Sequence, residues 1–130
     1  MTLKNTFKNN LDSIHKQLTE VSDWMYENPE LGFSEFKTSE YLVKFIESFN
    51  GEVSYPTGGL DTAFEITYGN KGPLVVLCVE YDALPEIGHA CGHNIIATAS
   101  IGAGLAIKDL VEKLDIRVKL LGTPAEEGGG

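Results

Sequence analysis

Two short runs, Leu74-Val75-Val76-Leu77-Cys78-Val79 and Ile116-Arg117-Val118-Lys119-Leu120-Leu121, set the expected architecture of the chain. The first is almost wholly apolar, which is typical of a central strand covered on both faces, and it makes Cys78 an ordinary buried thiol. Between the runs, Ile95 to Leu114 predicts a helix that approaches a sheet closely through its small residues, which are Ala97, Ala99, Gly102, Ala103, Gly104 and Ala106. Strand, helix and strand in this order predict parallel pairing through a crossover.

The first half of the chain predicts two helices and two short strands. Apolar residues recur at helical spacing after Leu11, so a helix is expected from about Leu3 to Asn28. Ser34 can cap a second helix that ends at Asn50-Gly51. The buried face of that helix is expected to comprise Tyr41, Leu42, Phe45, Ile46 and Phe49. Strands at Glu52–Tyr55 and Thr62–Tyr68 complete an α/β fold, with a mixed, partly parallel sheet flanked by helices.

Composition limits the classes of partner. The chain has 130 residues, of which 42% are hydrophobic and 22% charged, as in ordinary globular domains. Its 10 basic and 19 acidic residues give a net charge of -9, which disfavours binding to nucleic acids and to anionic membrane surfaces. No run is apolar and long enough to span a membrane, and the N-terminus lacks the pattern of a secretion signal. Two cysteines without a disulfide framework favour the cytoplasm.

Residues suited to metal chemistry follow each of the two expected strands. The run Gly88-His89-Ala90-Cys91-Gly92-His93-Asn94 offers imidazole and thiolate, which zinc prefers, and a bend at Gly92 would turn Cys91 and His93 toward one point. The run Gly122–Glu127 adds two adjacent carboxylates. Because parallel strands end at one edge of a sheet, a single cleft is expected to hold Asp82, Cys91, His93, Glu126 and Glu127. Such a cleft predicts a metal centre with a carboxylate left for acid–base work.

The chain carries three ordered motifs, Tyr81–Pro85, Gly88–Asn94 and Gly122–Gly129, and an opening stretch Asn28–Phe33 that is followed by Glu35 and Thr38. Together they resemble the amidohydrolase branch of the aminoacylase and carboxypeptidase metallopeptidases, peptidase family M20. That branch includes hydrolases of indoleacetyl-amino acids, of p-aminobenzoyl-glutamate and of certain dipeptides. The resemblance implies that residues 1–130 are an incomplete N-terminal portion of the catalytic domain, with the lid and dimerisation domain absent.

The resemblance also implies a mechanism. Two metal ions, commonly zinc and in some members manganese or cobalt, activate a water that attacks the amide of an N-acyl amino acid or dipeptide, in an enzyme that is a homo-oligomer. By position, Cys91, His93 and Glu127 match metal ligands, Glu126 matches the general base, and Asp82 matches an acidic residue behind the metals. Asn94 stands where many relatives have aspartate. Two further histidine ligands are implied, whereas this chain contains only His15, His89 and His93.

Alternative functions remain open at this point. Cys91 could be a nucleophile with a histidine base, although His93 is too close in sequence to be placed easily for that role. The chain could also be a truncated, catalytically silent fragment that binds metal or a partner, because it stops at the glycine run Gly128–Gly130 and lacks the implied histidines. A nucleotide-binding role for the glycine run is not favoured, since no Gly-Lys-Ser/Thr follows it.

Overall fold

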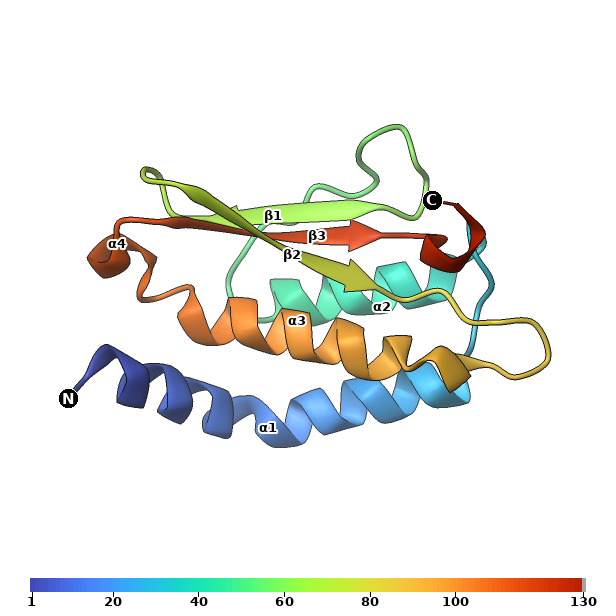
Figure 1. Ribbon diagram of the computed structural model, residues 1–130, viewed down its shortest axis with the longest axis horizontal. Coiled ribbons are helices and arrows are strands. Elements are labelled where there is room, and N and C mark those ends of the chain that lie inside the picture. The colour runs from blue at the N-terminus through green and yellow to red at the C-terminus, as the bar shows by residue number, and fades with distance from the viewer. Residues whose placement is uncertain (130) are drawn as a thin grey trace.

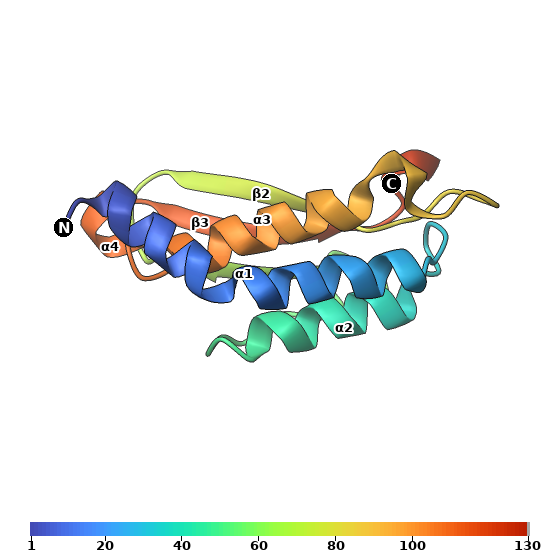
Figure 2. The same ribbon diagram turned by 90° about the horizontal axis from the view of Figure 1, so that it is seen from below.

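The computed structural model describes residues 1–129 (Figure 1). The elements are α1 (Leu3–Glu27), α2 (Phe36–Glu47), β1 (Phe64–Tyr68), β2 (Leu74–Glu80), α3 (His93–Ile107), α4 (Val111–Leu114) and β3 (Arg117–Thr123). The three strands form a sheet, α3 packs against it, and α1 packs against α3 (Figures 1 and 2). The α/β fold with a mixed, partly parallel sheet is therefore confirmed. None of the helices within residues 1–129 is both long enough and apolar enough to cross a membrane.

The sheet brings the two loops of interest to the same end of the molecule. Its strand order is β1-β3-β2, with β1 antiparallel to β3 and β2 parallel to β3. Cys78 lies opposite Leu121 and Glu80 lies opposite Thr123, so β2 and β3 end level with one another. Figure 1 shows both arrowheads at the same end of the sheet. The predicted parallel crossover through α3 is thus present.

Close helix packing depends on small residues of α3. A Cβ atom at Gly104 would lie 2.6 Å from the Leu120 side chain on β3, and one at Gly102 would lie 2.8 Å from Leu18 on α1. Both separations are shorter than real carbon contacts, so a larger residue at either position would force Leu120 or Leu18 to move, and glycine lets α3 lie close to both the sheet and α1. The fully buried side chains of the core include Met25, Leu42, Ile46, Phe64, Ile101 and Leu120.

The prediction that Leu74–Val79 is a central strand covered on both faces is wrong for the part of the chain that the structure describes. There β2 is an edge strand, and its side chains at Leu74, Val75 and Val76 are 41%, 45% and 43% exposed. Cys78 is exposed as well, so the prediction of a buried thiol is also wrong. An apolar run predicts a strand that can be buried, but the sequence pattern alone does not show whether that strand lies at the centre or at the edge of the sheet.

Three local predictions are corrected. Residues 52–55 form no strand, since Ser54 alone makes an isolated bridge, to Glu65. The helix expected over 95–114 is divided into α3 and the single-turn α4. Ser34 does not cap α2; the Glu30 carboxylate instead accepts the backbone N–H groups of Lys37 (3.2 Å) and Thr38 (2.5 Å) in its first turn. A carboxylate satisfies these free donors as well as a hydroxyl does and also complements the helix dipole.

The exposed edge of β2 predicts self-association of this chain. An apolar edge strand offers free backbone groups and apolar side chains to a second copy. We expect the lysine substitution Val76→Lys to weaken association roughly tenfold, equivalent to about 1.4 kcal/mol. Leu60→Lys, at a comparably exposed leucine outside the sheet, is the control. Sedimentation velocity over a concentration series measures the self-association constant of both variants. Equal constants for the two variants would exclude the β2 edge as the contact between copies.

Candidate metal centre

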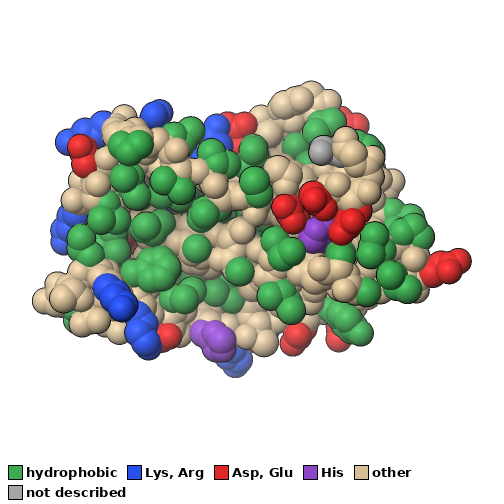
Figure 3. Space-filling view, viewed as in Figure 1, with side chains coloured by type: hydrophobic (Ala, Val, Ile, Leu, Met, Phe, Trp, Pro, Cys, Tyr) green, Lys and Arg blue, Asp and Glu red, His purple; other side chains and the backbone are tan. Residues whose placement is uncertain are grey.

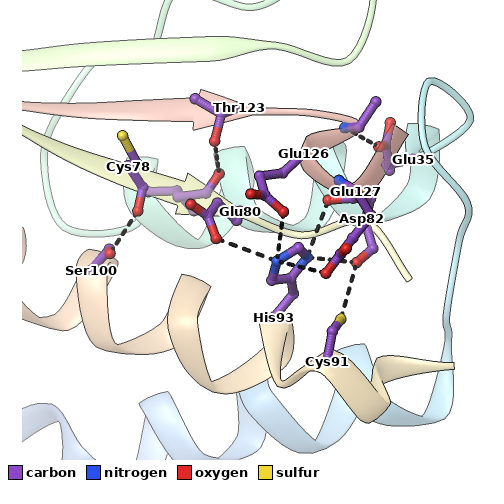
Figure 4. A network of polar contacts seen from close by, with 12 residues as sticks. Glu35, Cys78, Glu80, Asp82, Cys91, His93, Ser100, Thr123, Glu126 and Glu127 are labelled. Carbon is purple, nitrogen blue, oxygen red and sulfur yellow. Dashed lines mark hydrogen bonds and ion pairs between the residues drawn. The ribbon is translucent and has the colours of Figure 1, made fainter. Parts of the chain in front are cut away.

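The segment after β2 places a cysteine and a histidine side by side. Residues Leu84 and Gly88 pair across a tight loop, which leads into the short 3-10 helix His89–Cys91. Gly92 follows with φ of 88°, a left-handed conformation that glycine adopts without strain, and α3 begins at the next residue. The predicted bend at Gly92 is therefore present, and it brings Cys91 and His93 to the same side of the loop (Figure 4).

The segment after β3 turns two glutamates toward the same point. Ala125 is fully buried and has φ of 57°, a conformation that is unusual for a residue with a side chain. It redirects the chain into the short 3-10 helix Glu126–Gly128. Both glutamates are partly exposed and face the His93 ring from the β3 side (Figure 4).

The imidazole of His93 is the centre of this arrangement, and its side chain is only 3% exposed. Its Nδ1 lies 2.8 Å from the backbone carbonyl oxygen of Asp82. Because a carbonyl only accepts, Nδ1 carries a proton and donates it, so Nε2 is the ring nitrogen that is left to bind another group. That Nε2 faces three carboxylates: Glu80 at 3.3 Å, Glu126 at 3.6 Å and Glu127 at 3.9 Å.

Three carboxylates gathered around one ring nitrogen repel one another unless a positive charge, such as a metal cation, lies among them. The donor set suits such a cation. Ligand atoms of Cys91, His93 and Glu127 lie within 4.8 Å of one another, and so do those of Glu80, His93 and Glu126. Figure 3 shows an imidazole surrounded by acidic side chains on this end of the molecule. Nitrogen, sulfur and oxygen donors at this spacing fit a zinc-like ion.

Asp82 joins the pieces of the site and is 1% exposed. Besides the His93 contact, its carbonyl oxygen lies 3.9 Å from Sγ of Cys91. Its carboxylate Oδ2 accepts the backbone N–H of Glu127 at 3.0 Å. One residue therefore contacts the cysteine, the histidine and the glutamate loop, and the structure brings together all five side chains that the sequence placed in one cleft.

Buried polar atoms without a partner concentrate beside this cluster. Within residues 1–129 the buried side-chain atoms without a hydrogen bond are both ring nitrogens of His89 and Oδ1 of Asp82, and the latter lies 3.1 Å from Nδ1 of His93. Burial, with a smaller contribution from His93, lowers the pKa of His89 below its ordinary value, while Asp82 opposes the shift. A buried imidazole whose two nitrogens have no hydrogen-bond partner, next to the cluster, is expected where a ligand completes a site.

Sequence reasoning missed two acidic residues here. Glu80 was not singled out, although an acid that closes an apolar strand two residues before Asp82 was a usable signal. Glu35 was noted only as part of the family-like opening stretch. In the structure it is fully buried: Oε1 accepts the N–H of Ala125 at 2.8 Å and Oε2 accepts the Thr62 hydroxyl at 3.0 Å. The opening stretch therefore anchors the loop that carries Glu126 and Glu127.

Loss of the Glu35 anchor is expected to destabilise the fold. Glu35→Ala leaves the Ala125 N–H and the Thr62 hydroxyl buried without partners, which costs about 3 kcal/mol of unfolding free energy. Glu40→Ala removes an exposed carboxylate from the following helix, α2, and is the control. Urea unfolding gives both values. Equal midpoints for the two variants would show that the Glu35 contacts contribute little.

Comparison with known proteins gives consistent matches. The chain is 31% identical to a subunit of the p-aminobenzoyl-glutamate hydrolase of Escherichia coli, over 92% of its own length and 29% of that protein. It is 35% identical to the Xaa-Arg dipeptidase of Mus musculus, over 98% of its length and 33% of the relative. No family model matches the sequence. The chain thus spans about a third of the length of these curated relatives.

A solved structure agrees with these relatives. A Bacillus subtilis protein described as a dinuclear metal binding peptidase from the M20 family superposes with a TM-score of 0.78 at 26% identity. The match covers 89% of this chain and 36% of that protein. The chain belongs to the M20 amidohydrolase family, and the resemblance identified from its motifs is confirmed.

Proposed function

We propose that this chain contributes to a metal-dependent hydrolase that cleaves the amide bond of an N-acyl amino acid or dipeptide. The observation that carries the proposal is the His93 Nε2 atom, which faces three carboxylates within 3.9 Å and has Cys91 on another side. The relatives named above are a hydrolase of p-aminobenzoyl-glutamate and a dipeptidase, which supports the substrate class. When bound, a divalent cation would polarise the amide and lower the pKa of water.

Each residue of the cluster has its own part in this function. Cys91, His93 and Glu127 would hold the ion, since their ligand atoms form one compact group. Asp82 fixes the His93 tautomer through its carbonyl oxygen and the Glu127 position through its carboxylate. Glu126 has a side chain that is 49% exposed, so it can accept a proton from water and deliver it to the leaving nitrogen.

Zinc is the ion that this donor set favours, because thiolate and imidazole are its preferred ligands. The similarity to the Bacillus subtilis protein, a dinuclear metal binding peptidase, supports a site for two ions. Two free cysteines suit a reducing compartment, and we propose the cytoplasm.

A second function has its own support. Of the three histidines, only His93 belongs to a group of possible ligands within residues 1–129, and His15 is exposed on α1. One imidazole is few for a two-ion centre. We therefore keep as the alternative a catalytically silent fragment that binds metal.

Both candidate functions require the chain to bind a metal ion, and zinc binding to the 130-residue chain tests this requirement. Wild-type protein is titrated with Co²⁺, whose thiolate charge-transfer absorption reports a bond to Cys91, and Zn²⁺ then competes. We expect a saturable band that Cys91→Ser removes, whereas Cys78→Ser, at the exposed thiol on β2, keeps it. No band in the wild type would contradict both functions.

Amine release then separates the two functions. The zinc-loaded chain is incubated with N-acetyl amino acids and with dipeptides. Hydrolysis that disappears on chelation supports the enzyme, and metal binding without any hydrolysis supports the silent fragment.

A further inference from the structure

A cavity of about 280 Å³ lies beside the metal centre and shares a wall with it. Its lining includes Glu127, which belongs to the group of possible ligands with Cys91 and His93. It also includes Asp82, whose carbonyl oxygen accepts from His93. Three segments of the chain meet around the cavity: the connection between α1 and α2, the loop after β2 and the turn after β3. Figures 1 and 2 show all three at the same end of the molecule.

Backbone contacts hold the walls of this cavity together. The N–H of Ala83 donates to the carbonyl oxygen of Glu30 at 2.8 Å, and Leu31 pairs with Ala83 in an isolated parallel bridge. On the side of the turn after β3, a Cβ atom at Gly32 would lie only 2.9 Å from Cβ of Ala125. The connection between α1 and α2 is therefore packed against both loops of the metal centre, so a ligand would meet a cavity that is already formed.

Phe33 lines this cavity in an unusual backbone conformation. The N–H of Ser34 donates to the carbonyl oxygen of Leu31 at 2.9 Å, which closes a four-residue turn, and Phe33 is its third residue with φ of 63°. A positive φ at this position of a turn favours glycine or asparagine and is rare for a bulky side chain. Phe33 is also 51% exposed. Core packing therefore does not account for a phenylalanine here, and its ring is accessible to a ligand in the cavity.

Polarity and charge decide which part of a substrate the cavity can take. The larger apolar side chains of its lining are Leu31, Phe33, Leu84 and Pro85. The charged side chains among the described residues of the lining are both acidic, Asp82 and Glu127. An N-acyl amino acid has a free carboxylate on one side of its amide and an acyl group on the other. Glu127 would repel that carboxylate, whereas an apolar acyl group would leave water for an apolar lining.

We propose that this cavity binds the acyl group of the substrate and that Phe33 is a specificity-determining residue, which selects an apolar acyl group over a small one. The inference rests on the proposed amide hydrolysis, because it places the acyl side of the amide next to Glu127 and the ion. The volume of about 280 Å³ is at the small end for a ligand site and suits a single ring. A ring there would bury more apolar area than a methyl group does and would pack against the ring of Phe33.

The test uses two neutral ligands that differ in the acyl group alone, N-methylbenzamide and N-methylacetamide. Ligand-observed NMR titration measures their dissociation constants for the 130-residue chain, with and without one equivalent of Zn²⁺. We expect N-methylbenzamide to bind at least about tenfold more tightly under both conditions, because the cavity acts through its apolar lining. Phe33→Ala is expected to lower this ratio to about threefold or less. Phe36→Ala is the matched control and should keep the ratio, since Phe36 is also 51% exposed but is not among the described residues that line the cavity.

The outcomes are distinguishable. Equal affinity of the wild type for the two amides, no binding of either, or the same ratio in Phe33→Ala and Phe36→Ala overturns the acyl cavity. Tighter binding of butylguanidine than of N-methylbenzamide also overturns it, because the acidic side chains would then make a cation site. In each of these cases the Co²⁺–thiolate band at Cys91 decides separately whether the proposed metal-dependent function stands. Should circular dichroism show that Phe33→Ala does not fold, Phe33→Gly decides, because glycine lacks the ring and adopts a positive φ without strain.

Discussion

The substitution His93→Ala is expected to reduce divalent metal affinity by more than about 100-fold, a larger effect than that of any other single side chain. The reason is geometric: His93 is the one residue common to both groups of possible ligands within residues 1–129. Its loss leaves thiolate and carboxylates of like charge with no neutral donor among them. Competition between the protein and a chromogenic chelator for Zn²⁺ measures the affinity.

His15→Ala provides the matched control, because it removes an exposed imidazole from α1, outside both groups. His93 is buried and begins α3, so its removal also leaves a cavity. His93→Gln retains most of the volume and a neutral side chain, which separates loss of the ligand from loss of packing. Zinc affinity equal to that of His15→Ala in both His93 variants would exclude this histidine as a ligand.

The fold could be predicted where local pattern and tertiary structure agree. Helical spacing gave α1 to within one residue, and the small residues of the 95–114 segment indicated the close approach seen at Gly104. The position of β2 in the sheet could not be predicted, because an apolar run fits either an edge strand or a central strand. The cap of α2 was missed because Glu30 reaches it from eight residues before Thr38, beyond the usual capping window.

The site could be predicted in part, because the direction of two neighbouring strands determines where the loops that follow them lie. Parallel β2 and β3 bring Asp82, Cys91 and Glu126 together, as their positions after the strands indicated. The supporting contacts depend on tertiary structure. Glu35 lies ninety residues from Ala125 in the chain, and no local pattern reports their hydrogen bond. Glu80 was hidden because a charged residue at a strand end is ordinary by itself.

Two adjacent glutamates raise the question of which one moves protons. The backbone N–H of Glu127 is tied to the buried Asp82 carboxylate, and its side chain belongs to the group with Cys91. Glu126 has the more exposed side chain of the two, at 49% against 39%. The fixed residue suits a ligand, and the exposed residue suits proton transfer, which needs access to both water and substrate.

In an M20 hydrolase that contains this segment, Glu126→Gln is therefore expected to lower the rate of amide hydrolysis by about 100- to 10,000-fold while metal content stays unchanged. Glutamine keeps the shape of the side chain but cannot accept the proton of water at neutral pH. Glu127→Gln is the matched comparison: it changes the same group one residue away and should lower zinc content together with activity. Atomic absorption and a free-amine assay on the same samples measure the two quantities. Loss of zinc in Glu126→Gln, with zinc retained in Glu127→Gln, would mean that the two glutamates have the opposite roles.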